Sequence, residues 1–333
     1  MSNITIIYPI FSFLLFFVCA KISYEFYLLD LPSKRKFHHT ATAYTGGIGI
    51  SVAYIFAILI VDIPSNNLNL ILSIGFLISI VGLIDDRFNL NVGGKLSLQI
   101  IPIFYLIVFE NLSLSHIGEY NNFKLELGAF SIPFTLLSVL LLINAFNYLD
   151  GMDGTLSFST ISVLIILYYL IPNQEEKLFL VVIIIPIFIF LFFNFSMFRL
   201  PKMFLGDSGS LLIGFIISFT LIYFSAQNLV HPILLAWSIV IFVYEFLSIN
   251  LIRLKNKKNP FQAGQDHLHH ILFSKTKSLI LTNLFIVLMN IFFFILGYLS
   301  FLFISPLASL ILFIILFIFF LFIRNKYRKT LNY

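Results

Sequence analysis

Charged residues are scarce in this sequence. Asp, Glu, Lys and Arg make up 11% of the 333 residues, whereas a soluble domain carries roughly 25%. Hydrophobic residues make up 60%, and the mean hydropathy is +1.02. Apolar runs of about 20 residues, long enough to cross a bilayer as helices, recur along the whole chain with no soluble stretch between them. This composition excludes a soluble enzyme and predicts one integral membrane domain over residues 1–333.

Cysteine and nucleotide-binding motifs are also scarce or missing. Cys19 is the single cysteine, which excludes an internal disulfide and a cysteine metal cluster. No G-x-x-x-x-G-K-[ST], G-x-G-x-x-G or G-x-S-x-G pattern occurs, so any nucleotide is bound without a P-loop or a Rossmann unit. The net charge of +5 comes from short loops and forms no extended basic face. We therefore expect membrane lipid, and no nucleic acid, as a partner.

The apolar runs predict an all-α polytopic protein with eleven transmembrane helices. The first run has no basic stretch before it and no small-residue cleavage site after it, which favours a retained helix over a signal peptide. Residues 116–133 alternate apolar and polar side chains around Asn121, which predicts a small β-hairpin on the outer side. The expected spans are approximately 4–24, 46–63, 68–84, 95–109, 131–144, 155–171, 178–194, 209–224, 232–251, 278–301 and 303–323.

The distribution of basic residues predicts the orientation of these spans. Of the 20 Lys and Arg residues, only Lys124 and Lys177 fall in one set of loops, and the rest fall in the other set. Loops rich in Lys and Arg stay in the cytoplasm. This places the C-terminus in the cytoplasm and the N-terminus outside.

Aspartate residues gather on the predicted cytoplasmic side. A carboxylate that faces lipid near the bilayer centre costs roughly 2.5–3.5 kcal/mol, so five of them would cost on the order of 15 kcal/mol. That exceeds the stability margin of a typical fold, so these groups face water, a metal ion or a cationic partner. The aspartates on this side are Asp30, Asp85, Asp86, Asp150, Asp153, Asp207 and Asp266, and the cost given for five applies to Asp85, Asp86, Asp150, Asp153 and Asp207.

The stretch GLIDDRFNL, residues 82–90, places Asp85 and Asp86 directly after an apolar run. Hydration at the membrane surface explains either acid alone, but adjacent carboxylates repel each other unless a cation neutralises them. Mg²⁺ or Mn²⁺ suits such oxygen ligands, and Mg²⁺ commonly completes its shell with phosphate oxygens and water. The pair therefore favours a divalent cation and a phosphate-bearing substrate.

Two further acidic motifs each have a structural and a functional explanation. NAFNYLDGMDG, residues 144–154, fits a helix end followed by Asx turns, and it also fits a pocket in which glycine backbone approaches a ligand. FLGDSGSLLIGF, residues 204–215, places Asp207 and Ser208 where they can cap the next helix. A helix N-terminus is also an anion site, so this stretch could hold a metal ligand and a phosphate.

Two cytoplasmic loops are rich in basic residues and histidine. DLPSKRKFHH, residues 30–39, is explained by the positive-inside bias alone. The later loop contains His267, His269 and His270, and such triplets suggest zinc. On a helix, however, only the first and third of these share a face, and no third strong ligand is evident. Contacts to a diphosphate or nucleotide are favoured.

Taken in order, DxPSxRKxH, GLIDDRFNL, NAFNYLDGMDG, NFSMFRLPKMFLGDSGSLLIGF and HLHH resemble the polyprenyl-phosphate N-acetylhexosamine-1-phosphate transferases, the MraY-like and WecA-like enzymes. The terminal HLHH is more similar to the WecA-like branch. The resemblance implies transfer of a sugar 1-phosphate from a UDP-N-acetylated sugar to undecaprenyl phosphate, with release of UMP, at the start of cell-envelope glycan synthesis. It also implies Mg²⁺, or Mn²⁺, and a site on the cytoplasmic face of the bacterial inner membrane. Whether the protein forms a homodimer is left open.

The resemblance also assigns expected roles to individual residues. It implies that Asp85 deprotonates or orients the lipid phosphate and that Asp86 supports the metal or substrate. The implied catalytic residues are Asp85, Asp86 and Asp207, and the implied metal ligands are Asp207, Asp150 and Asp86. The implied substrate-binding residues are Asn147, Asp150, Asp153, Asn194, His267, His269, His270, Lys95, Arg35 and His38.

Some positions depart from the family pattern. Ala41, Ala43 and Tyr44 stand where P-x-P-R is usual, Gly264 and Gln265 replace an acid and an arginine, and Glu245 replaces an Asp. These changes put the identity of the sugar in doubt more than the type of reaction. An ion-coupled transporter or flippase is the alternative, but it would place charges near the membrane midplane and in repeated halves. An inactive scaffold is disfavoured because the acids of all three motifs are present.

Overall fold

The computed structural model describes residues 6–32, 40–63, 65–121, 123–259, 264 and 266–330, the last four by their backbone alone. Two of the expected substrate-binding residues, Arg35 and His38, lie outside the described residues. The chain forms two compact units. Unit 1 comprises Met1–Glu110 and Pro172–Thr220, and unit 2 comprises Asn111–Ile171 and Leu221–Tyr333.

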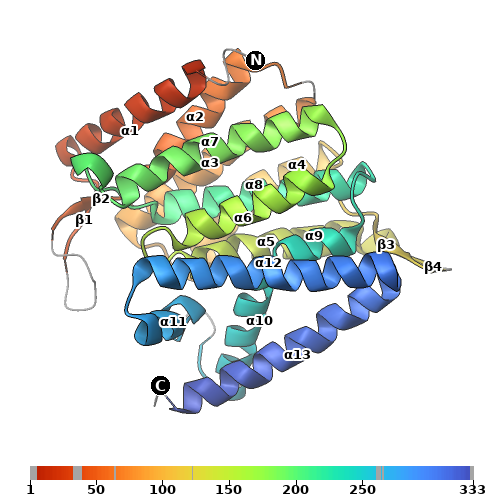
Figure 1. Cartoon of the computed structure of the whole chain (residues 1–333). Coiled ribbons are helices and arrows are strands. Elements are labelled where there is room, and N and C mark those ends of the chain that lie inside the picture. The colour runs from red at the N-terminus through yellow and green to blue at the C-terminus, as the bar shows by residue number, and fades with distance from the viewer. Residues whose placement is uncertain are drawn as a thin grey trace. The chain divides into compact units, whose positions relative to one another are not determined.

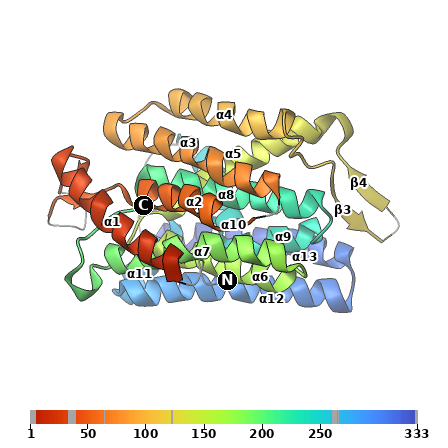
Figure 2. The same ribbon diagram turned by 90° about the horizontal axis from the view of Figure 1, so that it is seen from above.

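Unit 1 is a set of packed helices with one two-stranded antiparallel sheet (Figure 1). Helices α1, α2 and α7 pack against one another, and α3 lies beside both α2 and α4, as Figure 2 also shows for α3 and α4. Helix α8 begins in unit 1 and continues past its end. The elements are α1 Tyr8–Glu25, β1 Leu29–Asp30, β2 Thr42–Ala43, α2 Gly46–Ile60, α3 Asn66–Phe88, α4 Val92–Val108, α7 Gln174–Asn194, the 3-10 helix η3 Met197–Arg199 and α8 Gly206–Ala226.

Two buried tyrosines of unit 1 bind backbone carbonyls of α7 just before a proline. Pro186 has no N–H, so it frees a carbonyl one turn earlier in the helix. The hydroxyl of Tyr8 donates to the Val182 carbonyl at 3.1 Å, and that of Tyr54 donates to the Ile183 carbonyl at 3.1 Å. The freed carbonyl belongs to Val182, and in a bilayer it must be satisfied within the protein. The two tyrosines thus tie α1 and α2 to α7.

Unit 2 contains a β-hairpin and a second group of helices. Helix α12 packs against α6, α9, α11 and α13, while α10 packs against α5. The rings of Phe146 and Phe242 stack with centroids 3.9 Å apart. The elements are β3 His116–Tyr120, β4 Phe123–Glu126, the 3-10 helix η2 Gly128–Phe130, α5 Ser131–Leu149, α6 Thr155–Leu170, α9 Pro232–Ser238, α10 Val240–Lys255, α11 Leu268–Thr276, α12 Leu279–Phe303 and α13 Pro306–Thr330.

The span expected as a single helix over residues 232–251 is two helices, α9 and α10, bent by 75°. No glycine or proline marks the break at Ile239. Instead, the buried side chain of Asn290 in α12 donates to the Ser238 carbonyl at 3.0 Å and accepts from the Ile241 N–H at 3.4 Å. A polar side chain from another helix therefore satisfies backbone groups that the bend releases.

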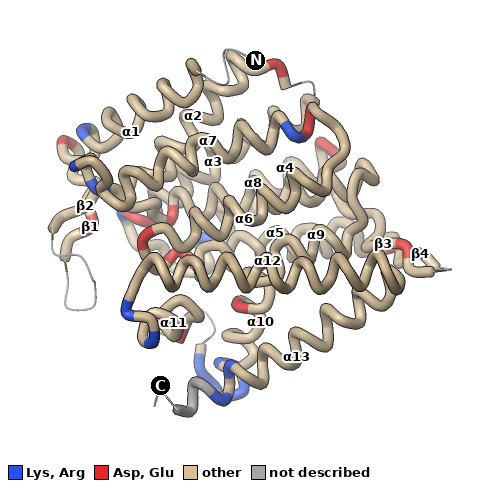
Figure 3. The backbone as a smooth tube through the Cα atoms, viewed as in Figure 1, with Lys and Arg blue, Asp and Glu red and all other residues tan. Residues whose placement is uncertain are grey.

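Helical segments lie at all eleven expected spans, but eleven crossings are not confirmed. Within the part of the chain that the structure describes, seven helices are long and apolar enough to cross a membrane, or eight if α9 and α10 form one span. Helices α2, α4 and α6 are apolar but have only 15, 17 and 16 residues. Figure 3 shows long uncharged stretches within the helices, with charges mainly at helix ends and in connections. The structure is that of a multi-pass, mostly helical membrane protein.

The expected hairpin is present as β3 and β4, which pair antiparallel with Tyr120 opposite Phe123. A second small sheet, β1 with β2, was not expected from the sequence. Its strands are only two residues long, so alternation of side chains gives no signal. The Phe204 N–H donates to the Ala43 carbonyl at 2.7 Å, and this contact brings the segment before α8 alongside β2.

Candidate active site

A lysine lies between two of the predicted catalytic acids in unit 1. Lys95, in the first turn of α4, places its Nζ 2.6 Å from Asp85 Oδ2 and 2.5 Å from Asp207 Oδ2. Asp85 lies in the last turn of α3, where its other oxygen accepts the Leu90 N–H at 2.9 Å. The side chains of Lys95 and Asp85 are 16% and 10% exposed, so the ammonium and carboxylate shield each other from an apolar surrounding.

The neighbouring acid, Asp86, binds the first turn of α8. Its carboxylate accepts the backbone N–H groups of Asp207 and Ser208 at 3.0 and 3.2 Å. A carboxylate is favoured at this position because the N-terminus of a helix carries partial positive charge and unpaired N–H groups. Two of the amides that the sequence suggested as a phosphate site are therefore occupied by Asp86, and Asp207 lies within the first helical turn, not at the N-cap.

Two glycines permit this close approach. A Cβ on Gly82 in α3 would lie 2.4 Å from the carbonyl oxygen of Asp207 and from backbone atoms of Ser208. Gly206 has a φ of +72°, and a Cβ there would lie 2.6 Å from Asp86 Oδ2. Only glycine combines that backbone conformation with this space. The GD pair thus has a structural reason: the glycine turns the chain so that the aspartate meets α3 and α4.

Asn194 ends α7 and is buried. Its side-chain amide donates to the Met203 carbonyl at 2.8 Å. This bond holds the segment that leads into α8, and hence Asp207, next to the end of α7. The observed contact is to backbone, and the expected contact of Asn194 with substrate stays a prediction.

The donor set of unit 1 suits a hard divalent cation. The acids are all carboxylates, which Mg²⁺ prefers. Asp85 and Asp207 contact the ammonium of Lys95, and Asp86 lies beside Asp207 at the start of α8, so three carboxylates gather in one place. Among the described residues, however, no three His, Cys, Asp or Glu side chains are arranged as a preformed metal site. Metal binding therefore remains a prediction.

The other predicted site residues belong to unit 2. Asn147 lies in the last turn of α5, Asp150 is its C-cap residue, and Gly154, with a φ of +76°, precedes α6. Asn283 of α12 fixes this turn: its side chain donates to the Asp153 carbonyl at 2.9 Å and accepts from the Thr155 hydroxyl at 2.7 Å. The glycines break the helix as expected.

The three histidines lie at the start of α11. His267 is the N-cap residue in an extended conformation, and its ring lies 6.4 Å from that of His270, three residues later. Its ring is parallel to that of His269, with centroids 5.5 Å apart, and the rings of His269 and His270 lie 4.3 Å apart. A Cβ on Gly151 would lie 2.0 Å from His269 Nε2. His269 therefore packs on the glycine-containing turn after α5.

Burial makes two of these histidines neutral. Burial, reinforced by the neighbouring rings of His270 and His267, lowers the pKa of His269 well below its usual value. Burial likewise lowers the pKa of His270. Both ring nitrogens of His269 are buried without a hydrogen-bond partner among the described residues. A buried imidazole without partners is costly, so this ring is suited to accept or donate a bond to a ligand.

Sequence reasoning gave too little weight to some residues. Lys95 was expected only as a substrate-binding residue, yet it contacts two of the three expected catalytic acids. Asn283 and Gly82 were not identified at all. A polar side chain in an otherwise apolar helix was the available signal for Asn283, and a glycine one turn before an Asp-Asp pair was the signal for Gly82.

Comparison with known proteins gives a consistent result. The model of the family described as glycosyl transferase family 4 matches residues 68–225. An undecaprenyl-phosphate alpha-N-acetylglucosaminyl 1-phosphate transferase of Yersinia pestis is 30% identical over 279 residues, covering 82% of this chain and 76% of that protein. The enzyme of the same name from Escherichia coli O157:H7 is 30% identical, covering 79% and 74%.

A more distant relative extends the comparison. A probable undecaprenyl-phosphate N-acetylglucosaminyl 1-phosphate transferase of Bacillus subtilis is 28% identical, covering 77% of this chain and 73% of that protein. The matched region includes both acids of α3 and the start of α8, where the residues of unit 1 converge. The chain belongs to glycosyl transferase family 4.

Proposed function

We propose that this protein transfers an N-acetylhexosamine 1-phosphate from a UDP-sugar to undecaprenyl phosphate and releases UMP. The observation that carries the proposal is the contact of Lys95 with Asp85 and Asp207, beside an Asp86 that holds the start of α8. The names of the relatives favour N-acetylglucosamine as the first donor to test.

The proposed reaction is a displacement at the β-phosphorus of the UDP-sugar. A phosphate oxygen of the lipid attacks the β-phosphorus of the UDP-sugar, and a new O–P bond forms. The bond between that phosphorus and the bridging oxygen breaks, and the bridging oxygen leaves with UMP. Phosphoryl transfer depends mainly on positioning and charge neutralisation. Asp85, held by Lys95 and the Leu90 amide, orients the lipid phosphate or takes its proton, and Lys95 offsets negative charge beside it.

A divalent cation belongs to the same proposal. The carboxylates of Asp207 and Asp86 in unit 1 would hold Mg²⁺, with Mn²⁺ as a substitute, and the ion would neutralise the diphosphate of the donor. The assignment of Asp150 as a third ligand rests on the family resemblance alone. The gathering of three carboxylates at the ends of α3 and α8 supports the proposal.

The proposed location is the bacterial inner membrane, with the reaction on the cytoplasmic side. The excess of Lys and Arg in one set of loops supports this orientation. All three acids around Lys95 lie at helix ends, α3 and α8, and so suit a reaction at the membrane surface. A transporter would instead place such charges near the midplane.

The test uses membranes that contain the full-length protein, undecaprenyl phosphate, Mg²⁺ and one labelled UDP-sugar at a time. We expect a butanol-extractable labelled lipid and an equal amount of UMP. Omission of Mg²⁺ should remove both products. If no UDP-N-acetylhexosamine in a panel yields UMP from membranes in which the protein is present, the proposed function is wrong.

Asp207→Ala is the first variant to test. It removes a carboxylate that contacts Lys95, and we expect turnover to fall by about 10²–10³-fold, the typical effect of removing one charge-stabilising group from an active site. Removal of the exposed carboxylate of Glu119 in β3, as Glu119→Ala, is the matched control and should leave the rate unchanged. Near-normal turnover of Asp207→Ala, at normal protein level, would exclude Asp207 from the reaction.

A further inference from the structure

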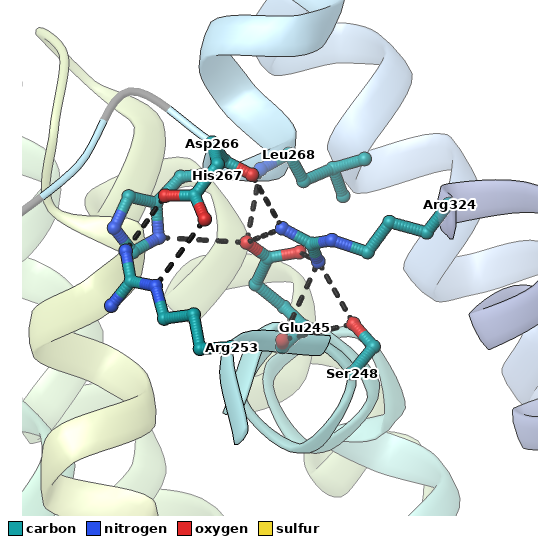
Figure 4. A network of polar contacts seen from close by, with 7 residues as sticks. All are labelled: Glu245, Ser248, Arg253, Asp266, His267, Leu268 and Arg324. Atoms are coloured by element: carbon teal, nitrogen blue, oxygen red, sulfur yellow. Dashed lines mark hydrogen bonds and ion pairs between the residues drawn. The ribbon is translucent and has the colours of Figure 1, made fainter. Parts of the chain in front are cut away.

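A buried ion pair joins the last helix of unit 2 to α10. Glu245 of α10 is fully buried, and the side chain of Arg324 of α13 is 5% exposed. The guanidinium contacts both carboxylate oxygens of Glu245, and its Nη1 also donates to the Ser248 hydroxyl at 2.9 Å (Figure 4). Arg324 lies 79 residues from Glu245 and outside the stretch that the family model matches.

The same pair holds the start of α11. Glu245 Oε1 accepts the Leu268 N–H, the first of the helix, at 2.9 Å, and Arg324 Nη2 donates to the Asp266 carbonyl at 2.8 Å. The N-cap residue, His267, makes no side-chain cap. The carboxylate of Glu245 therefore supplies the cap from another helix, at a position where negative charge is favoured.

A second ion pair fixes the residue just before the histidines. Arg253 donates to both carboxylate oxygens of Asp266, at 2.7 and 3.3 Å. Burial raises the pKa of Asp266, but the bonds from Arg253 outweigh burial and hold the pKa below its usual value, so the pair stays ionised. Figure 4 shows Asp266 between the two arginines, which hold its carboxylate and its carbonyl.

Stability alone does not account for this arrangement. Apolar residues of similar size often replace a buried ion pair without loss of stability. Here Glu245 accepts the Leu268 N–H and Arg324 donates to the Asp266 carbonyl, so the pair binds the backbone on either side of His267. His267 Nδ1 itself lies 3.6 Å from Glu245 Oε1. The geometry therefore fixes where the histidine rings point.

We propose that Glu245 and Arg324 are positioning residues that anchor the start of α11 and so orient His267, His269 and His270 toward the diphosphate of a nucleotide-sugar donor. The donor part of this inference rests on the proposed function. Under this proposal helix α13, through Arg324, helps to position the residues that bind the donor.

The decisive variant is the double substitution Glu245→Gln with Arg324→Met. Either single change leaves one charge buried without its partner, which can prevent accumulation of the protein. The double change leaves no unpaired charge but removes the fork of hydrogen bonds. Arg324→Lys keeps the charge and loses the fork. Lys326→Met, on the exposed face of α13, is the matched control for loss of one cation.

Two measurements on the full-length protein in lipid nanodiscs separate positioning from folding. The first is amide hydrogen exchange of peptides that cover residues 264–276. The second is the KM for UDP-sugar, the KM for undecaprenyl phosphate and kcat. In the double variant we expect faster exchange confined to that segment and a donor KM raised about tenfold or more, because small misplacements near a reacting group cost up to about 10²-fold. The lipid KM and the Lys326→Met variant should stay at wild-type values.

The outcomes decide the inference. Wild-type exchange and a wild-type donor KM in the double variant would overturn it, as would equal changes in the donor and lipid KM. A wild-type donor KM in the Arg324→Lys variant would overturn the requirement for the guanidinium group of Arg324. If the wild type releases no UMP but the double variant still exchanges faster at residues 264–276, the proposed function fails while the anchoring of α11 stands.

Discussion

Lys95 is the residue on which the acidic cluster of unit 1 depends. Its ammonium lies within 2.6 Å of carboxylates from two helices, α3 and α8. Removal of one partner from a buried ion pair costs about 3–5 kcal/mol because the remaining charge is left without compensation. In the proposed reaction the same charge also offsets that of an anionic substrate, so its loss should affect both stability and turnover.

Lys95→Met and Lys95→Arg separate these two effects. We expect Lys95→Met to lower the protein level in membranes and to lose activity of the remaining protein by about 10²-fold or more. Lys95→Arg should restore the level because the charge is kept, with only partial activity because the fork geometry differs. Lys21→Met, at an exposed position in α1, is the control. Immunoblots and UMP release per protein measure both effects, and unchanged specific activity of Lys95→Met would contradict the assigned role.

At the scale of helices and strands, close contacts of glycine set the position of α8. Gly82 and Gly75 both lie on α3 and both face α8, but they differ in what a methyl group would meet. At Gly82 the obstacle is backbone, at 2.4 Å, whereas at Gly75 it is the flexible end of the Leu212 side chain, at 3.0 Å. Backbone cannot move aside as a side-chain end can.

Gly82→Ala is therefore expected to disrupt the site, and Gly75→Ala is its matched control. Overpacking of this kind costs typically about 1–3 kcal/mol. We expect Gly82→Ala to lower the melting temperature of the purified protein and to reduce turnover, since it pushes the first turn of α8 away from Asp86. Gly75→Ala should retain most activity. Equal behaviour of the two variants would show that the contact of α3 with α8 does not position Asp207.

A histidine also joins the β-hairpin to α9. His231 Nδ1 accepts the Ile233 N–H at 3.2 Å as the N-cap of α9, and its Nε2 lies 3.0 Å from the Glu119 carbonyl oxygen. Burial lowers the pKa of His231, the hydrogen bond to the Glu119 carbonyl raises it, and the nearby His116 lowers it further. The net direction is downward, so the folded state holds the neutral ring.

This shift gives a pH dependence of defined sign. Between the lowered folded pKa and the usual value of about 6.5, the unfolded state binds more protons, so stability rises with pH. The stability that the neutral His231 ring contributes is complete above about pH 6.5 and is lost as the pH falls toward the pKa of His231 in the folded state. We expect the protection of β3 and the first turn of α9 from amide exchange, after correction for the intrinsic pH dependence of exchange, to decrease between pH 7.5 and 5. His231→Asn keeps an N-cap without a titrating ring and should remove this decrease. If its pH dependence matches the wild type, His231 is not the cause.

At the scale of the whole molecule, the proposed reaction requires that the acids of α3 and α8 be on the same side of the membrane. Both belong to unit 1, and Lys95 contacts Asp85 of α3 and Asp207 of α8. The orientation that the Lys and Arg distribution predicts makes that side cytoplasmic, with the hairpin β3–β4 outside. Because Cys19 is the only cysteine, its replacement gives a background for labelling.

Single cysteines in a Cys19→Ala protein test this topology. Phe88, Phe198 and Phe123 are 71%, 82% and 48% exposed, so each accepts a cysteine at the surface. We expect Phe88→Cys and Phe198→Cys to react with a membrane-impermeant thiol reagent from the cytoplasmic side only, and Phe123→Cys from the outside only. Labelling of Phe88→Cys and Phe198→Cys on opposite sides would overturn the site and the proposed function together.

Local chemistry alone predicted much of this protein. Apolar runs placed helices at all the expected spans because each run is long enough to form a helix whatever its neighbours. Alternation around Asn121 gave the hairpin, and the order of the acidic motifs gave the family. Each of these signals is contained within a few consecutive residues, so one sequence suffices to detect it.

Only the tertiary structure decided which side chains meet. Lys95 contacts Asp207 across 112 residues, and Arg324 contacts Glu245 across 79. No glycine or proline marks the bend between α9 and α10 in the sequence. The side chain of Asn290 in α12 binds the Ser238 carbonyl at this bend. Periodicity and composition report on neighbours along the chain. Pairing of charges and release of backbone groups depend on which helices pack together, and that information appears only when the chain is folded.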